Sequence, residues 1–160
     1  MARQLWLLRH ADAEPHGTRP DSERRLTERG ERQARLAGVA IARMGVEFET
    51  LLSSPRERAL RTATVAVQAW SEAQRNRLEV HPPLAGGFDA REALALLAGL
   101  DADGRLLLVG HEPDLSTVVA ELTGARIDLK KGGLAVVRVD GAGGELVALL
   151  RPSELALIAE

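Results

Sequence analysis

Two histidines that each follow an apolar run are the residues of this sequence best suited to chemistry. His10 comes after Leu5–Leu8 and Arg9, and His111 comes after Leu106–Gly110. In an open α/β sheet, ligands bind at the carboxyl ends of the strands. A neutral imidazole can accept a phosphoryl group near neutral pH, because its ordinary pKa of about 6.5 leaves much of it uncharged. The pattern therefore points to phosphoryl transfer through a phosphohistidine, with an ordinary structural histidine as the alternative at each position.

Arginines follow a third apolar run, at the start of an expected helix. Arg56, Arg58 and Arg61 come after Thr50–Ser53 and Pro55. A guanidinium donates paired hydrogen bonds to phosphate and stays charged, and a helix N-terminus adds a field that favours anions. The spacing does not say which of the three arginines points toward the histidines, and each could instead be a solvated helix residue.

Zinc binding is a third use of histidine, beside catalysis and structure. None of the four histidines (His10, His16, His81 and His111) lies in a His-x-x-x-His or Glu-x-x-His spacing. The chain has no cysteine, which excludes disulfides, thiolate zinc sites and cysteine nucleophiles. We therefore expect neither a metal nor another cofactor.

Length and composition fit one ordinary globular domain that spans residues 1–160. The 21 lysines and arginines are balanced by 23 acidic residues, so nucleic acid is not expected as the main partner. No apolar stretch approaches the roughly 18 residues of a membrane span, and the short apolar run near the N-terminus does not resemble a secretory signal. We therefore expect no membrane association and a cytoplasmic location.

Hydrophobic patterns alternate between strand and helix periods along the chain. We expect strands at residues 4–8, 50–53, 78–80, 105–109, 134–139 and 145–150. We expect helices from Thr27 to about Met44, from Ser54 to about Trp70, from Asp89 to Leu100, and from Pro113 to about Leu122. Ser54 and Glu57 form an expected capping box, and the glycine-rich turn at 141–144 predicts a closing hairpin. This order of elements predicts an α/β sandwich with a mixed sheet.

Several segments, taken together, resemble the histidine phosphatase superfamily and its phosphohistidine phosphatase (SixA-like) branch. The family hallmark is Arg-His-Gly after the first strand, and this chain has Arg9-His10-Ala11, with the alanine that we associate with that branch. The resemblance continues in family order through residues 24–30, 52–63, 109–116 and 130–135, and so spans nearly the whole chain. It implies a three-layer α/β/α sandwich with a mixed, mostly parallel sheet, as in phosphoglycerate mutase.

The resemblance also implies roles for individual residues. It makes His10 the acceptor of the phosphoryl group and Arg9 a clamp on the phosphate. Arg58 matches the family arginine in this region, and His111 matches the second histidine of the pocket. Arg24 falls where the branch has an additional arginine on the substrate side. The implied activity is hydrolysis through a covalent phosphohistidine.

Many members of the superfamily use a carboxylic acid to protonate an alcohol leaving group, and the corresponding region here holds Asp89 and Glu92. We interpret these two residues as a capping box at a helix start rather than as a catalytic acid. A protonated imidazole leaves readily without such an acid. The short chain and the lack of an evident acid therefore favour phosphohistidine in a protein, such as a phosphotransfer domain, as the substrate.

Other functions stay open at this stage. A phosphomonoesterase acting on a small phosphorylated substrate would use Asp89 or Glu92 as its acid, and a regulatory module would bind phosphate without turnover. A mutase is disfavoured, because no cap is evident that would hold an intermediate product. Lys130 and Lys131 could contact phosphate or an acidic partner, although a solvated surface pair is the simpler interpretation.

Overall fold

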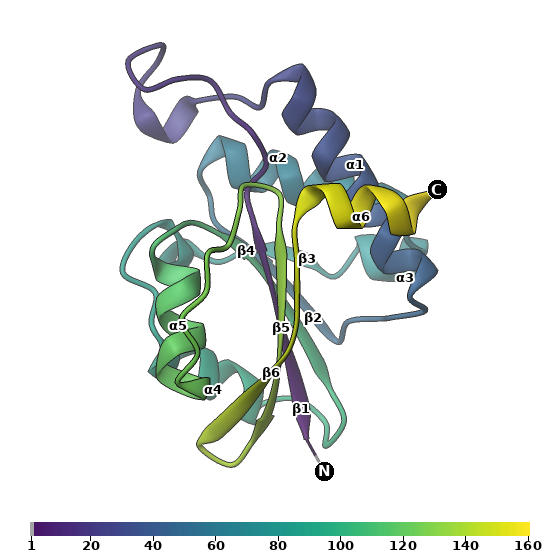
Figure 1. Cartoon of the computed structure of the whole chain (residues 1–160), viewed down its shortest axis with the longest axis vertical. Coiled ribbons are helices and arrows are strands. Elements are labelled where there is room, and N and C mark those ends of the chain that lie inside the picture. The colour runs from purple at the N-terminus through teal and green to yellow at the C-terminus, as the bar shows by residue number, and fades with distance from the viewer. Residues whose placement is uncertain (1) are drawn as a thin grey trace.

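The computed structural model describes residues 2–160, in which strands and helices alternate before a final hairpin (Figure 1). Six strands of this part of the chain form one sheet in the order β3-β2-β4-β1-β5-β6. The strands are β1 (Arg3–Arg9), β2 (Thr50–Ser53), β3 (Leu78–Val80), β4 (Arg105–Gly110), β5 (Leu134–Asp140) and β6 (Gly143–Leu150). The first four pair in parallel, whereas β5 and β6 are antiparallel to their neighbours. The predicted mixed, mostly parallel sheet is confirmed.

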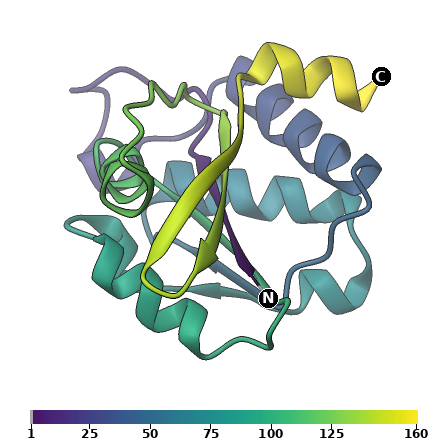
Figure 2. The same ribbon diagram turned by 60° about the horizontal axis from the view of Figure 1, so that its bottom comes forward.

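Helices cover both faces of the sheet and make three layers (Figure 2). They are α1 (Glu28–Arg43), α2 (Glu57–Ala66), α3 (Glu72–Arg75), α4 (Ala90–Ala98), α5 (Asp114–Thr123) and α6 (Pro152–Ala159). Helices α1, α2 and α6 pack on one face, and α4 and α5 pack on the other. The α/β/α sandwich is therefore confirmed. Among residues 2–160, no helix combines the length and the apolar composition that a membrane span requires.

The central strand β1 explains why the apolar runs are unbroken. Leu5 and Leu7 join the core beneath α4 and α5, whereas Trp6 and Leu8 join the core beneath α1, α2 and α6. Successive side chains of a strand point to opposite faces, and here both faces are covered. Every position in the middle of the strand is therefore apolar, and the next polar residues appear only where the strand ends.

The start of α1 is fixed beside the segment that follows His10. Thr27 is the N-cap, as predicted, and its hydroxyl oxygen accepts a hydrogen bond from the Gly30 N–H at 3.0 Å. A Cβ at Gly30 would lie 2.0 Å from the Asp12 carbonyl oxygen. Only glycine allows this close approach, so the helix packs directly against the backbone that leaves β1.

The start of α2 differs from the prediction. The helix begins at Glu57 with Arg56 as its N-cap, so the expected capping box on Ser54 is wrong. The Ser54 hydroxyl oxygen does accept a hydrogen bond from the Arg56 N–H at 3.1 Å, but the same oxygen also pairs with His111. The position of Ser54 is therefore set by its hydrogen bond to the buried His111 imidazole rather than by capping of α2.

The end of α2 also comes earlier than predicted. The α-helix stops at Ala66 and is followed by a 3-10 turn, Val67–Ala69, instead of continuing to Trp70. The indole N–H of Trp70 donates a hydrogen bond to the Gly38 carbonyl oxygen at 2.9 Å. Burial of this large side chain against α1 therefore redirects the chain.

The last helix, α6, was not predicted at all. Pro152 occupies its first turn, and the Glu154 carboxylate accepts a hydrogen bond from the Arg151 N–H at 2.8 Å. Leu155 and Ala159 are buried in the core beneath α1 and α2. The segment is too short to show a clear helical period, so its contact with α1 decides the structure.

Candidate active site

The structure brings His10 and His111 together at the carboxyl edge of the sheet. They follow β1 and β4, which are adjacent and parallel, and the His10 N–H donates a hydrogen bond to the Gly110 carbonyl oxygen at 3.0 Å. Their ring centroids are 5.4 Å apart. The side chains are buried, with 6% of His10 and 7% of His111 exposed. This proximity was predicted from the position of both residues after strands.

The orientation of the His10 ring leaves one nitrogen available. Its Nδ1 lies 2.8 Å from the Ala11 carbonyl oxygen, which can only accept, so Nδ1 carries the proton. Nε2 therefore keeps a free lone pair. The pKa of His10 is lowered to about 4, chiefly by burial and in smaller part by the charges of Arg58, Arg9 and Lys131, against the opposing effect of the Ala11 hydrogen bond. The ring is neutral, and hence nucleophilic, at neutral pH.

The second histidine has the opposite arrangement of donor and acceptor. The Nε2 of His111 lies 2.7 Å from the Ser54 hydroxyl, which already accepts from the Arg56 N–H. The proton of that hydroxyl has no other acceptor within residues 2–160, so we assign the hydroxyl as the donor to Nε2, which places the proton of the neutral ring on Nδ1. The pKa of His111 is lowered to about 3, chiefly by burial and in smaller part by the neighbouring His10, Arg58 and Arg56. The Nδ1 is buried and has no hydrogen-bond partner within residues 2–160.

Two arginines of the site also keep a buried donor without a partner. Arg9 Nη1 donates to the Leu129 carbonyl oxygen at 3.0 Å, and Arg58 Nη1 donates to the Asp21 carbonyl oxygen at 2.7 Å. The Nε of each guanidinium is buried and unpaired within the described chain. Burial lowers the pKa of both groups, although an arginine stays charged at any physiological pH.

Arg58 is more deeply buried than Arg56 and Arg61, the other two arginines of its segment. Arg58 is 6% exposed and lies on the inner side of the first turn of α2. Arg61 is exposed and pairs with Glu31 of α1 at 2.9 Å. Arg56 donates through Nε to the Ala85 carbonyl oxygen at 2.8 Å, which ties the loop before α4 to the site. Arg58 is thus the buried arginine of the three.

A carboxylate that the sequence analysis missed lies among the arginines. Asp21 accepts from Arg24 Nε at 3.1 Å, lies 3.3 Å from Arg58 Nη2, and also contacts Arg56 Nη1. Burial opposes ionisation of Asp21, but the charges of Arg58 and Arg24 outweigh it and lower the pKa of the carboxyl group. The only local feature of the sequence that could have indicated this ion pair is the spacing of three residues between Asp21 and Arg24. Arg24 itself is buried here, with 7% exposed.

A buried threonine joins the two halves of the site and was also missed. The Thr62 hydroxyl oxygen accepts from the Ala11 N–H at 3.0 Å and donates to the Arg58 carbonyl oxygen at 2.7 Å. It therefore connects the segment after His10 to the first turn of α2. Nothing in the sequence marks Thr62, because a helical threonine ordinarily faces solvent or its own backbone.

The two candidate acids lie at the start of α4. The Asp89 side chain accepts from the Glu92 N–H at 2.9 Å and so caps the helix, as predicted. The expected capping box is only half formed, because the Glu92 side chain does not return the bond and its Oε2 is buried without a hydrogen-bond partner in residues 2–160. Within residues 2–160, neither carboxylate forms a hydrogen bond or ion pair with His10, His111 or a site arginine. The same part of the chain contains no group of three or more His, Asp or Glu side chains placed to hold a metal ion.

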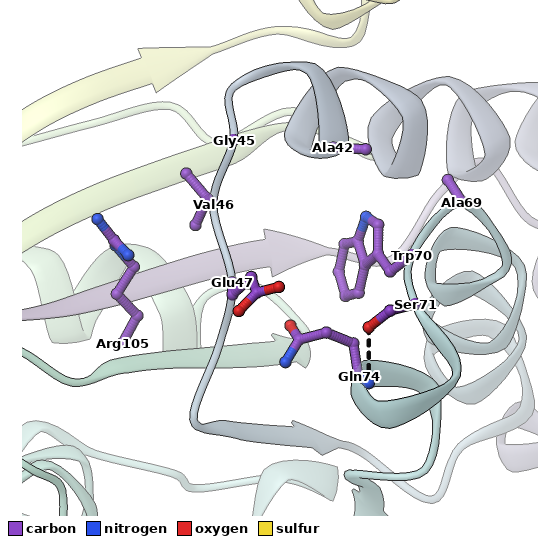
Figure 3. Close-up of a pocket in the computed structure, with 9 residues that line it drawn as sticks. All are labelled: Ala42, Gly45, Val46, Glu47, Ala69, Trp70, Ser71, Gln74 and Arg105. Atoms are coloured by element: carbon purple, nitrogen blue, oxygen red, sulfur yellow. Dashed lines mark hydrogen bonds between the residues drawn. The ribbon is translucent and has the colours of Figure 1, made fainter.

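A cavity of about 420 Å³ opens at the opposite edge of the sheet, beside Trp70, Gln74 and Arg105 (Figure 3). Its main polar groups already serve the fold. Gln74 accepts from the Phe48 N–H and donates to the Phe48 carbonyl oxygen, each at 2.8 Å. The cavity lies at the amino ends of β2 and β4, far along the strands from the histidines, and the hydroxyl of Ser71 in its lining serves as the N-cap of α3.

Comparison with protein families identifies the fold around this site. Residues 5–84, half of the chain, match the model of the histidine phosphatase superfamily, branch 1. The chain belongs to the histidine phosphatase superfamily. The matched segment includes Arg9, His10, Arg24 and Arg58, whereas His111 lies beyond it. An uncharacterized protein of Picosynechococcus is 33% identical over 150 residues, which cover 87% of each chain.

Solved structures of histidine phosphatases superpose on almost the whole chain. The protein histidine phosphatase SixA, determined with tungstate, is 27% identical, with a TM-score of 0.83 over 95% of this chain and 99% of that one. Phosphoglycerate mutase from Bacillus anthracis is 14% identical, with a TM-score of 0.78 over 99% and 97% of the two chains. The SixA-like resemblance and the phosphoglycerate mutase-like fold are both confirmed.

Proposed function

We propose that this protein is a phosphohistidine phosphatase that transfers the phosphoryl group to Nε2 of His10 and then to water. One observation carries the proposal. Of the four buried side-chain atoms without a hydrogen-bond partner in residues 2–160, three are donors around the two histidines: Arg9 Nε, Arg58 Nε and His111 Nδ1. The membership of the histidine phosphatase superfamily and the likeness to SixA support a phosphatase.

Unpaired buried donors need an explanation, because each costs about 1–3 kcal/mol in the folded protein. A phosphoryl group supplies three oxygens that can accept hydrogen bonds, and its charge suits two guanidinium groups. Binding of that group would satisfy all three donors at once. The site is therefore complementary to a transferring phosphoryl group, whose charge is spread over these oxygens.

The neutral ring of His10 starts the reaction. Its Nε2 lone pair forms a bond to phosphorus, while the bond from phosphorus to the substrate imidazole breaks and the electron pair leaves with that imidazole. Arg9, Arg58 and His111 donate to the three oxygens as the charge redistributes. In the second step, a water oxygen attacks phosphorus, the electron pair of the P–N bond returns to Nε2, and one proton of the water passes to a phosphoryl oxygen, so that dihydrogen phosphate leaves. Two easier displacements thus replace one difficult one.

We infer the substrate class from whether the site has an acid that could protonate the leaving group. Asp89 is engaged as a helix cap, and neither Asp89 nor Glu92 forms a hydrogen bond or ion pair with His10 or His111 within residues 2–160. An alkoxide would need such an acid, whereas an imidazole with a proton on its second nitrogen leaves as a neutral molecule. The likeness to the protein histidine phosphatase SixA supports the same substrate.

The deciding experiment compares phosphate release from a histidine-phosphorylated protein, a phosphoserine peptide and a sugar phosphate. We expect kcat/KM for the phosphohistidine protein to exceed the other two values by at least about 100-fold. Preference for the sugar phosphate, lost on Asp89→Asn or Glu92→Gln, would instead establish a phosphomonoesterase. Binding of inorganic phosphate without turnover of any of the three substrates would identify a regulatory module.

A further inference from the structure

A second charged feature lies beside the site, and apart from Arg9 its residues take no part in the proposed chemistry. It is a groove of about 440 Å³ whose lining includes Arg9, Arg29, Lys130, Lys131, Arg151 and Asp12. We call it the basic groove. Arg9 is shared with the phosphoryl site, so the groove begins where the site ends. Lys130 and Lys131 are the only lysines in the chain.

The backbone holds the two lysines at a fixed place relative to His10. The Gly132 N–H donates to the His10 carbonyl oxygen at 3.0 Å, and the Arg9 N–H donates to the Gly133 carbonyl oxygen at 3.1 Å. The left-handed conformation of Gly132, with φ of 75°, sharpens this turn against α1. The loop that carries the lysines is therefore docked on the end of β1.

The charge of the basic groove contrasts with that of the molecule. Five of its lining residues are cations and one is an acid, in a chain whose net charge is −2. The acid, Asp12, already accepts a hydrogen bond from the Thr27 hydroxyl at 2.7 Å. Its distance to Lys131 is 4.0 Å. The groove is thus a local region of positive potential beside the nucleophile.

The ion pairs that the groove residues make are exposed and easily exchanged. Lys130 pairs with Asp128, whose side chain is 76% exposed, and Arg151 pairs with Glu154. Arg29 forms no ion pair within residues 2–160. Exposed pairs contribute little free energy, so a carboxylate from another molecule can replace the internal partner at small cost.

We propose that the basic groove binds an acidic segment of the phosphoprotein substrate, adjacent to its phosphohistidine. The inference rests on the proposed function and names the kind of protein that the enzyme accepts. The cations come from the end of β1, from α1, from the 130–131 loop and from the start of α6, so they are spread along the groove. Such a spread suits several carboxylates of one polypeptide segment better than a single second phosphate.

The test uses two synthetic phosphohistidine peptides that differ only in their flanks, one with Asp and Glu and the other with Asn and Gln. We expect the wild type to have a kcat/KM about tenfold higher for the acidic peptide at low salt, and we expect the ratio to fall in 0.5 M salt, because screening weakens exposed ion pairs. In Lys130→Gln/Lys131→Gln the ratio should approach one. The matched control, Arg35→Gln/Arg43→Gln, removes the same charge from exposed positions on α1 outside the groove and should keep the ratio.

Carbodiimide coupling gives an independent readout, because it joins lysine amines to carboxylates. With only two lysines in the chain, the acidic peptide, blocked at both termini, should couple at Lys130 or Lys131, and the neutral peptide with the same blocked termini should not.

The two proposals fail in different ways. If the wild type releases no phosphate from phosphoramidate or from either peptide, the proposed function fails. If it hydrolyses both peptides with equal kcat/KM, or if the double lysine variant keeps the tenfold ratio, the phosphatase stands and the docking role of the groove is overturned.

Discussion

The rings of His10 and His111, which follow adjacent parallel strands, lie 5.4 Å apart and are tilted by 51°. Each ring has one nitrogen fixed by the protein, Nδ1 of His10 by a carbonyl oxygen and Nε2 of His111 by the Ser54 hydroxyl. The remaining nitrogens differ in kind, since one has a free lone pair and the other carries a proton. A phosphoryl group between them would meet a nucleophile and a donor.

Replacement of the nucleophile tests the first of these assignments. We expect His10→Ala to lower kcat for phosphohistidine hydrolysis by about 10³-fold or more, because no other lone pair in the site is so placed. The thermal unfolding midpoint should stay close to that of the wild type. A folded variant that retained more than a tenth of the activity would rule out His10 as the acceptor.

Replacement of a clamp tests whether the unpaired Nε of Arg58 matters. Arg58→Lys keeps the charge but removes the planar fork and its Nε–H, and we expect kcat to fall by about 100-fold. Arg61→Lys, three residues further along α2, is the control and should leave kcat unchanged, since Arg61 pairs with Glu31 on the surface. Equal effects of the two changes would contradict the role of Arg58.

The carboxylate of Asp21 competes with an incoming anion for the arginines. In Asp21→Asn, Arg24, Arg56 and Arg58 keep their bonds to backbone carbonyl oxygens but lose their ion-pair partner, and their mutual repulsion favours an external oxyanion. We therefore expect the inhibition constant of vanadate, measured against a phosphohistidine substrate, to fall by about three- to tenfold. A higher constant would mean that Asp21 mainly orients the arginines for the phosphoryl group.

The buried histidines make stability depend on pH. The pKa values in the folded protein, about 4 for His10 and about 3 for His111, lie below the ordinary value of 6.5. At a pH between the folded value and 6.5, each histidine is therefore more often protonated in the unfolded chain than in the folded protein. The free energy of unfolding therefore falls as the pH drops below 6.5, by about 1 kcal/mol per pH unit for each histidine between pH 6 and pH 5.

Denaturant titrations of His111→Asn at pH 6 and pH 5 check this contribution. Asparagine does not titrate, so the difference in unfolding free energy between the two pH values should be smaller than in the wild type by about 1 kcal/mol. Equal differences in both proteins would show that His111 is not held neutral in the folded state.

The crossing of α1 and α2 depends on a glycine. A Cβ at Gly38 would lie 2.2 Å from the Ala66 carbonyl oxygen, so Gly38→Ala must push the helices apart. We expect a loss of about 3 kcal/mol in the free energy of unfolding, measured by denaturant titration. Gly99→Ala is the control, because its nearest neighbour would be an atom 3.5 Å away. It should change the stability by less than about 1 kcal/mol.

The sequence by itself determined the strands and the residues that follow them. The apolar runs before His10 and His111 are the residues of strands covered on both faces, and parallel strands end at one edge of a sheet. These local rules suffice to place Arg9, His10 and His111 near one another. Thr27 at the start of α1 and Asp89 at the start of α4 were likewise predictable, because a cap needs only its own first turn.

Only the tertiary structure decided which side chains complete the site. Ser54 follows a capping pattern, yet the buried His111 takes its hydroxyl. Asp21 meets Arg58 across 37 positions of the chain. Lys131 lies in the groove beside Arg9 because its loop docks on β1. The local sequence determines the hydrophobic period and the caps of each helix or strand. Charge pairing and burial depend instead on which elements become neighbours, and only the folded structure shows which elements those are.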